Sequence, residues 1–194
     1  MHNVDEMADA VQAVLNHLQL KKYFIVGHSM GGYVGLSLAE HNPDAIRGLV
    51  MFHSTARGDS KEKKKDRNRA IKVVKRNAKI FIEEAIPNLF NTEHKPNIRG
   101  IEKSKKLALN MSKQGIIASL EGMKDRLERE IVLKFAPYPV LYIIGKEDNI
   151  LDYKDLMKQA ELPEQSSYLL LSKVGHMGFF EAKKECQSVI KHFI

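Results

Sequence analysis

A serine flanked by glycines is the first candidate for chemistry in this 194-residue sequence. Residues 27–32 read Gly-His-Ser-Met-Gly-Gly and lie between a short apolar run at 23–26 and a stretch of helical spacing at 32–41. A G-x-S-x-G pattern between a strand and a helix predicts a sharp turn that strains the backbone of Ser29 and exposes its hydroxyl. We interpret Ser29 as a nucleophile, with a simple glycine-rich turn as the alternative.

The same turn is expected to supply part of an oxyanion site. The helix that follows Ser29 points its N-terminus at the space beside the hydroxyl, and the backbone N–H of Met30 faces that space. Gly27 and Gly31, two residues before and after the serine, are expected to be small because larger side chains would collide. Met30 is therefore our candidate oxyanion donor.

A serine hydroxyl needs a base to become a nucleophile, and the base needs an orienting acid. Asp148 follows the apolar run at 140–144, and His176 follows the run at 168–171. The chain order serine, aspartate, histidine is the order that a nucleophile-elbow sheet requires. We therefore expect Asp148 and His176 to be the acid and the base that serve Ser29.

Other residues of the same types receive structural interpretations, with some alternatives left open. Glu147 and Asp152 could replace Asp148 as the acid. His28 is expected to point away from the reacting face. His53, at the end of a strand, is interpreted as structural, with a place in the pocket lining as the alternative. The remaining histidines are expected at the surface: His2, His17, His41, His94 and His192.

No sequence pattern indicates a cofactor or a metal. The chain has no phosphate-loop or dinucleotide-binding motif, and no Cys/His or carboxylate cluster with metal-ligand spacing. We expect the side chains alone to carry the reaction.

The elements that must position these residues follow from hydrophobic periodicity. Helical spacing occurs at residues 4–18, 32–41 and 182–193, and apolar runs typical of buried strands occur at 23–26, 48–52, 140–144 and 168–171. Such alternation predicts an α/β fold with a mostly parallel sheet flanked by helices. Loops at the carboxyl ends of the strands then gather into one crevice, where the site is expected.

A long helical insertion interrupts this pattern between the second and third strands. Residues 57–135 contain no convincing strand and read as helices broken near Pro87, Pro96 and Gly115. We therefore expect a core made of residues 1–56 and 136–194, with residues 57–135 as a cap. Apolar residues of the cap are expected to face the cleft or to hold the cap in place: Met111, Ile116, Ile117, Leu120 and Met123.

The positive charge of the chain lies in the insertion. Residues 57–130 hold 20 Lys/Arg and 11 Asp/Glu, whereas the rest of the chain has 11 and 13. The densest part, residues 61–79, has no interleaved aromatic residues, so we interpret it as a solvated helix face. Attraction to a membrane surface or a phosphate backbone is the alternative. We expect neither a nucleic-acid partner nor contact with a membrane.

Composition excludes several classes of protein. Hydrophobic residues make up 43% and charged residues 28%, as in ordinary globular domains, and no apolar run is long enough to span a bilayer. Cys186, the one cysteine, cannot form an intrachain disulfide and is interpreted as a small buried residue. Residues 1–6 carry acid where a signal peptide would carry Lys or Arg, so we expect a cytoplasmic location.

These motifs together resemble the α/β-hydrolase superfamily over essentially the whole chain. The resemblance lies in the segment at 27–32, the Gly-Lys-Glu-Asp turn at 145–148 and the Gly-His turn at 175–176. It implies a lidded, esterase-like serine hydrolase in which Ser29 attacks a carbonyl, His176 moves the proton and Asp148 fixes the imidazole. A serine nucleophile argues against the dehalogenase and epoxide-hydrolase branches, which use an aspartate.

One departure from the family concerns the segment before the serine. Family members carry several strands there, together with a loop that supplies a second oxyanion donor, so we expect an N-terminally truncated version of the fold. The strand at 23–26 would then be an exposed apolar edge that favours homo-oligomers. Loss of one oxyanion donor costs ~10²–10³ in turnover.

We expect carboxylic-ester hydrolysis through an acyl-enzyme, on a small hydrophobic ester or related acyl substrate. The alternative is a non-catalytic fragment of a longer hydrolase whose exposed sheet edge binds a partner.

Overall fold

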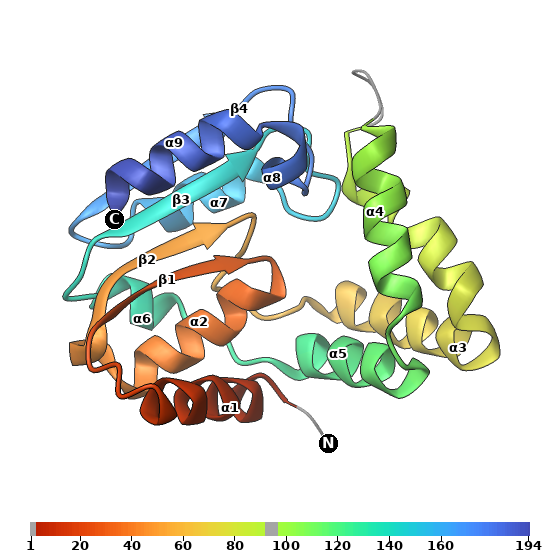
Figure 1. Ribbon diagram of the computed structural model, residues 1–194, viewed down its shortest axis with the longest axis horizontal. Helices are drawn as coiled ribbons and strands as arrows, with labels where there is room; N and C mark the ends of the chain where they lie inside the picture. The colour runs from red at the N-terminus through yellow and green to blue at the C-terminus, as the bar shows by residue number, and fades with distance from the viewer. Residues whose placement is uncertain (1–2, 92–96) are drawn as a thin grey trace.

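Four parallel strands form the central sheet of the computed structural model, which describes residues 3–91 and 97–194 (Figure 1). They are β1 (Tyr23–His28), β2 (Ile46–Phe52), β3 (Val140–Gly145) and β4 (Ser166–Leu171), in the order β1-β2-β3-β4. Each neighbouring pair is parallel, and each expected strand is present. The predicted α/β fold with a parallel sheet and flanking helices is confirmed.

Helices cover both faces of the sheet because side chains alternate between the faces along each strand. Leu49 and Met51 of β2 pack with the helices of one layer, and Val50 and Phe52 pack with the other. The first layer contains α2 (Met30–His41), α6 (Glu130–Lys134) and α7 (Tyr153–Ala160), and the second contains α9 (Lys183–Phe193). The short helices η1 (Pro43–Ala45) and α8 (Gly178–Glu181) precede β2 and α9.

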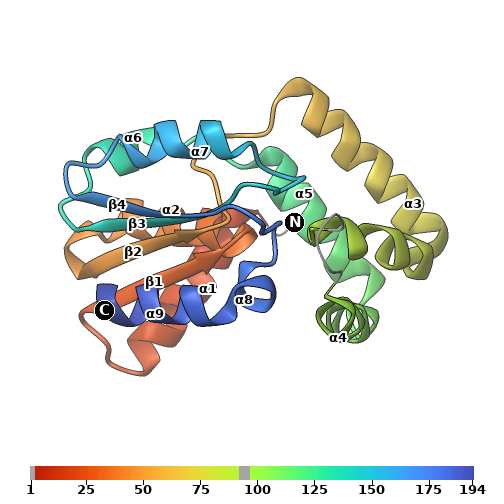
Figure 2. The same ribbon diagram turned by 90° about the horizontal axis from the view of Figure 1, so that it is seen from above.

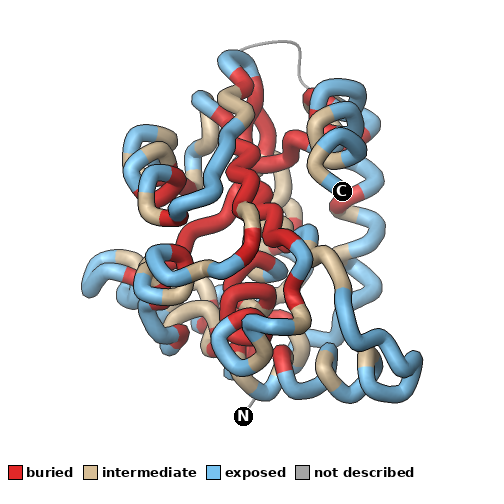
Figure 3. Tube along the Cα trace, turned by 90° about the vertical axis from the view of Figure 1, so that its left-hand side faces the viewer, coloured by how far each residue is buried: buried red, intermediate tan, exposed pale blue. Residues whose placement is uncertain are grey.

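Helix α1 (Val4–His17) packs on α2, outside the first layer. Figure 1 shows α9 on one side of the strands and α1 with α2 on the other. The two inner strands, β2 and β3, form the buried centre of the molecule (Figure 3).

The insertion folds as helices beside the sheet, and we propose that they form a cap (Figure 2). It contains α3 (Lys61–Ala85), the turn η2 (Pro87–Leu89), α4 (Ile98–Leu109) and α5 (Lys113–Asp125). A separate apolar cluster joins α3 to α5 through Ile71, Val74 and Ile82 on one side and the predicted Ile116, Ile117 and Leu120 on the other. These three predicted residues therefore hold the cap together.

The boundaries inside the cap differ in places from those expected. Pro96 lies outside the described residues. The break expected near Gly115 lies just before it, because Ser112 caps α5 and accepts a hydrogen bond from the Gly115 N–H over 3.0 Å. Leu133 of α6, inside the proposed cap range 57–135, packs with the sheet. The division into core and cap remains a proposal.

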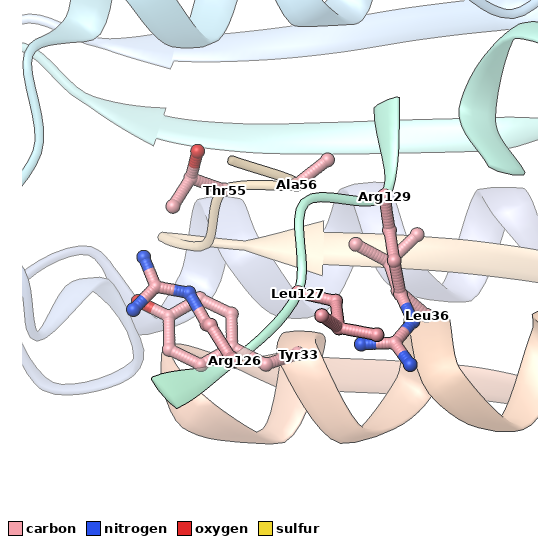
Figure 4. A pocket seen from close by; sticks show the side chains of 7 residues that line it. All are labelled: Tyr33, Leu36, Thr55, Ala56, Arg126, Leu127 and Arg129. Atoms are coloured by element: carbon pink, nitrogen blue, oxygen red, sulfur yellow. The ribbon is translucent and has the colours of Figure 1, made fainter. Parts of the chain in front are cut away.

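A buried ion cluster joins the two ends of the insertion. Asp59 pairs with Arg67 of α3 over 2.9 Å and with Arg126 over 2.6 Å, and the Asp59 side chain is fully buried. The Arg126 guanidinium also lies over the Tyr33 ring of α2, 4.1 Å from its centroid (Figure 4). Buried charges are tolerated only when paired in this way, so both ends of the cap are fixed at one point.

The basic segment at 61–79 forms the outer face of α3. Eight of its ten Lys/Arg side chains are exposed, while Ile71 and Val74 face inward. Lys63 is an exception, since its ammonium donates to the Ile150 carbonyl over 2.6 Å.

Strand β1 pairs only with β2 within the described part of the chain. Its Val26 is 44% exposed, so the expected apolar edge is present. No helix in the described ranges is long and apolar enough to cross a membrane.

Candidate active site

Ser29 lies at the junction of β1 and α2 in a strained conformation. Its φ of 51° and ψ of −118° are unusual for a residue with a side chain, as the sequence pattern predicts. Two contacts with the end of β2 hold it there. The Ser29 N–H donates to the Phe52 carbonyl over 2.9 Å, and the Ser54 hydroxyl donates to the Ser29 carbonyl over 2.8 Å.

The glycines around the serine differ in how closely they are packed. A Cβ on Gly27 would lie 2.6 Å from the Gly31 carbonyl oxygen, so Gly27 must be small. A Cβ on Gly31 would meet no atom within 4 Å, and the expectation for Gly31 was wrong. The second crowded position is Gly32, where a Cβ would lie 2.2 Å from the Ser54 hydroxyl. Ser54 is distant in sequence, so the pattern alone could not reveal it.

The structure brings Ser29, His176 and Asp148 into one hydrogen-bonded chain. Nε2 of His176 lies 2.8 Å from the Ser29 hydroxyl, and Nδ1 lies 2.7 Å from Oδ2 of Asp148. An ionised carboxylate only accepts hydrogen bonds, so Nδ1 carries the proton and Nε2 accepts from the serine. This is the tautomer that a general base requires.

Asp148 is held in its ionised form. Burial would raise its pKa, but hydrogen bonds from His176 and from the Ile150 N–H outweigh burial and hold the pKa well below its ordinary value. Of the two alternative acids, Asp152 instead caps α7, accepting from the Lys154 N–H over 2.9 Å.

The loop that carries His176 is fixed by residues that the sequence did not single out. Glu181 of α8 accepts hydrogen bonds from the N–H groups of Gly175 and Met177, on either side of the histidine. The His176 N–H donates to the carbonyl of Leu89 in the cap over 2.8 Å. The cap therefore contacts the backbone of the base directly.

His28 packs against His176, with 5.2 Å between the centroids of the two rings. Its Nε2 donates to the His176 carbonyl over 2.8 Å, and burial lowers the pKa of His28 to about 4. It is therefore neutral at pH 7.

His53 is fully buried beside the triad, and its Nδ1 lies 3.6 Å from Oδ2 of Asp148. His53, Asp148 and His176 each offer a metal-ligand atom, and these atoms lie within 4.8 Å of one another, a grouping that sequence spacing did not reveal. Because Asp148 and His176 already bind each other through a proton, we interpret the group as a triad with an adjacent histidine.

A cavity of about 760 Å³ lies between α4 and the segment that follows His176. Its lining is mostly apolar, with lysines among the lining residues: Lys103, Ser104, Leu107, Ala108, Met111, Met177, Phe179, Phe180 and Lys183. Met111 was expected to face a cleft, and it lines this one.

Comparison with known proteins identifies the family to which this fold and this site belong. The model of the alpha/beta hydrolase fold family matches residues 2–183. The chain belongs to the α/β-hydrolase family. Among solved α/β-hydrolase structures, a thermophilic esterase from Thermogutta terrifontis is similar over 98% of this chain and 71% of its own, with a TM-score of 0.89 and 30% identity.

Curated relatives in the family are more distant. The AB hydrolase superfamily protein YisY of Bacillus subtilis is 25% identical over 99% of this chain and 74% of its own length. The acetyltransferase component of the acetoin cleaving system of Pseudomonas putida is 25% identical over 99% of this chain, which spans 50% of that relative.

Proposed function

We propose that this α/β hydrolase is a serine esterase that cleaves carboxylic esters through an acyl-enzyme. The observation that carries the proposal is the hydrogen-bonded chain from Ser29 through His176 to Asp148. The similarity to an esterase at 30% identity supports the same reaction class.

In the proposed mechanism the Ser29 oxygen attacks the ester carbonyl while Nε2 of His176 accepts its proton. Asp148 stabilises the imidazolium that forms. The backbone N–H of Met30, at the start of α2, donates to the developing oxyanion, and the positive end of the helix dipole favours the same charge. His176 then protonates the leaving alcohol, and a water molecule activated by the same imidazole releases the acid.

The substrate is proposed to be a small hydrophobic ester. Met177, the residue that follows the base, lines the cavity. The lining is mostly apolar, which suits an acyl chain. Activity should therefore rise with acyl length until the cavity is filled.

Labelling with a fluorophosphonate probe tests the proposal, because the probe reacts only with a serine that its base has activated. We expect the wild-type chain to be labelled and Ser29→Ala and His176→Ala to be unlabelled. A second serine variant, Ser119→Ala, serves as the matched control, since the Ser119 hydroxyl bonds the Gly115 carbonyl inside α5 and should not affect labelling.

A panel of p-nitrophenyl esters of increasing chain length then measures the preference for the acyl group. A folded wild-type chain that is not labelled would contradict the proposal and favour the alternative of a non-catalytic binding protein. Labelling that survives in Ser29→Ala would show that another residue reacts.

A further inference from the structure

His53 occupies a backbone conformation that needs an explanation. It follows the last residue of β2, its φ is 44°, and its side chain is fully buried. A left-handed conformation costs a non-glycine residue of the order of 1 kcal/mol, so surrounding contacts must stabilise it.

The hydrogen bonds between β2 and β3 show what this conformation does. The His53 N–H donates to the Ile143 carbonyl over 2.9 Å, as in a regular parallel ladder. The next bond in such a ladder would run from the Gly145 N–H to the His53 carbonyl. Instead, Nδ1 of the His53 imidazole accepts from the Gly145 N–H over 3.2 Å. The side chain thus replaces a backbone acceptor.

Gly145 ends β3 just before the turn that carries Asp148, and this turn is anchored from two sides. On the β4 side, the Lys146 N–H donates to the Leu171 carbonyl and the Glu147 N–H donates to the Val174 carbonyl. On the β2 side, the imidazole of His53 provides the anchor.

The slot around the imidazole is built to its shape. A Cβ on Gly178 would lie 2.4 Å from Nε2 of His53, and a Cβ on Gly145 would lie 2.9 Å from its Cε1. Glycine at both positions makes room for the ring next to Asp148. The Asp148 and His176 side chains near the ring are 0% and 3% exposed.

We infer that His53 is a positioning residue, which fixes the turn that carries Asp148 and shields the Asp148–His176 pair from water. The inference rests on the proposed function for its catalytic meaning, whereas the geometry that it predicts can be measured without turnover. If His53 is removed, Asp148 should gain freedom and water, and it should stabilise the imidazolium of His176 less.

Four other ionisable groups lie near Asp148 and His176: His28, His53, Glu181 and Lys63. Burial lowers the pKa of both His28 and His53, so both are neutral at pH 7. Glu181 accepts hydrogen bonds from the backbone of the His176 loop, and Lys63 donates to the Ile150 carbonyl beside Asp148. A substitution at His53 removes none of the others.

The test is the titration midpoint of His176, measured by NMR on imidazole-labelled protein. His53→Leu removes the acceptor and keeps the bulk, and His53→Gly removes it without backbone strain. We expect both to lower the midpoint by about one pH unit, because a carboxylate that moves away stabilises the charged imidazole less. His53→Asn should stay near the wild-type midpoint, since Oδ1 can accept from Gly145 and asparagine tolerates a left-handed backbone.

Tyr142→Phe is the matched control, because Tyr142 of β3 is also fully buried and its hydroxyl has no partner among the described residues. It should leave the midpoint unchanged. A wild-type midpoint in folded His53→Leu or His53→Gly would overturn the inference, and so would an equal shift in His53→Asn.

The pH below which fluorophosphonate labelling declines should shift together with the NMR midpoint. An unlabelled wild-type chain would instead contradict the proposed function, and the NMR comparison would still decide the role of His53.

Discussion

Two adjacent glycines at the start of α2 differ sharply in what surrounds them. Gly32 faces the Ser54 hydroxyl that bonds the Ser29 carbonyl, whereas Gly31 faces open space. Gly32→Ala should push Ser54 away and displace the serine, lowering the rate of fluorophosphonate labelling by about 10². Gly31→Ala should label within about two-fold of wild type, because a helix accepts alanine readily. Equal rates in the two variants would contradict this account of the turn.

The assignment of the acid can be tested among three neighbouring carboxylates. Asp148→Asn should lower ester turnover by about 10³–10⁴, because the amide no longer fixes the tautomer of His176. Glu147→Gln and Asp152→Asn should retain turnover close to wild type. Steady-state kinetics on one p-nitrophenyl ester compare all three, and a large loss in Glu147→Gln would reassign the acid.

At the scale of elements, one buried carboxylate holds the two ends of the cap together. Asp59 neutralises both Arg67 and Arg126, and the Arg126 side chain is only 4% exposed. Asp59→Asn leaves a buried guanidinium without its counter-charge, which should lower the free energy of unfolding by about 3 kcal/mol. Urea denaturation measures this loss.

The control for that experiment lies seven residues further along the chain. Asp66 pairs with Arg69 on the exposed face of α3. Asp66→Asn should change the free energy of unfolding by less than about 0.5 kcal/mol, because water screens the pair. A similar loss in both variants would show that Asp59 does not hold the two ends of the cap together.

The sequence predicts the elements better than it predicts their contacts. Strands such as residues 140–144 could be recognised because a fully buried strand is continuously apolar, and the turn at Ser29 because its strain requires particular neighbours. The ion pair of Asp59 with Arg126 and the hydrogen bond between His53 and Gly145 could not be recognised, because the partners are distant in sequence. Such pairings exist only once the chain has folded.

For the whole molecule, buried neutral histidines make stability depend on pH. The pKa of His28 is about 4 in the folded chain, against about 6.5 when unfolded. Below pH ~6.5 His28 is protonated in the unfolded chain, whereas in the folded chain it stays neutral until pH ~4. The free energy of unfolding therefore falls as the pH drops through this window. His53 acts in the same direction.

Urea denaturation at pH 7 and pH 5 measures this effect. His28→Gln keeps a donor for the His176 carbonyl but cannot titrate. Between pH 7 and pH 5, its free energy of unfolding should therefore fall by about 2 kcal/mol less than that of wild type. His192→Gln, at the exposed end of α9, should behave as wild type. A loss in His28→Gln as large as that of wild type would show that His28 does not carry the effect.

The edge of the sheet bears on how copies of the chain associate. We propose that two copies pair through β1, because an exposed apolar strand is a template for another strand. Sedimentation velocity should show a dimer for wild type, and Val26→Lys should shift it to the monomer. A wild-type monomer at all concentrations would contradict this proposal.

The strand order also has a consequence for how the chain folds. β2 and β3 are neighbours in the sheet, yet residues 53–139 lie between them in sequence. Closing so long a loop costs little more than closing one of half the length, about 0.6 kcal/mol, but the search for the contact is slow. A cap with its own apolar cluster can form first and bring its two ends together at Asp59 and Arg126. The order of assembly would then run from the cap to the sheet, and the triad would be complete only at the last step.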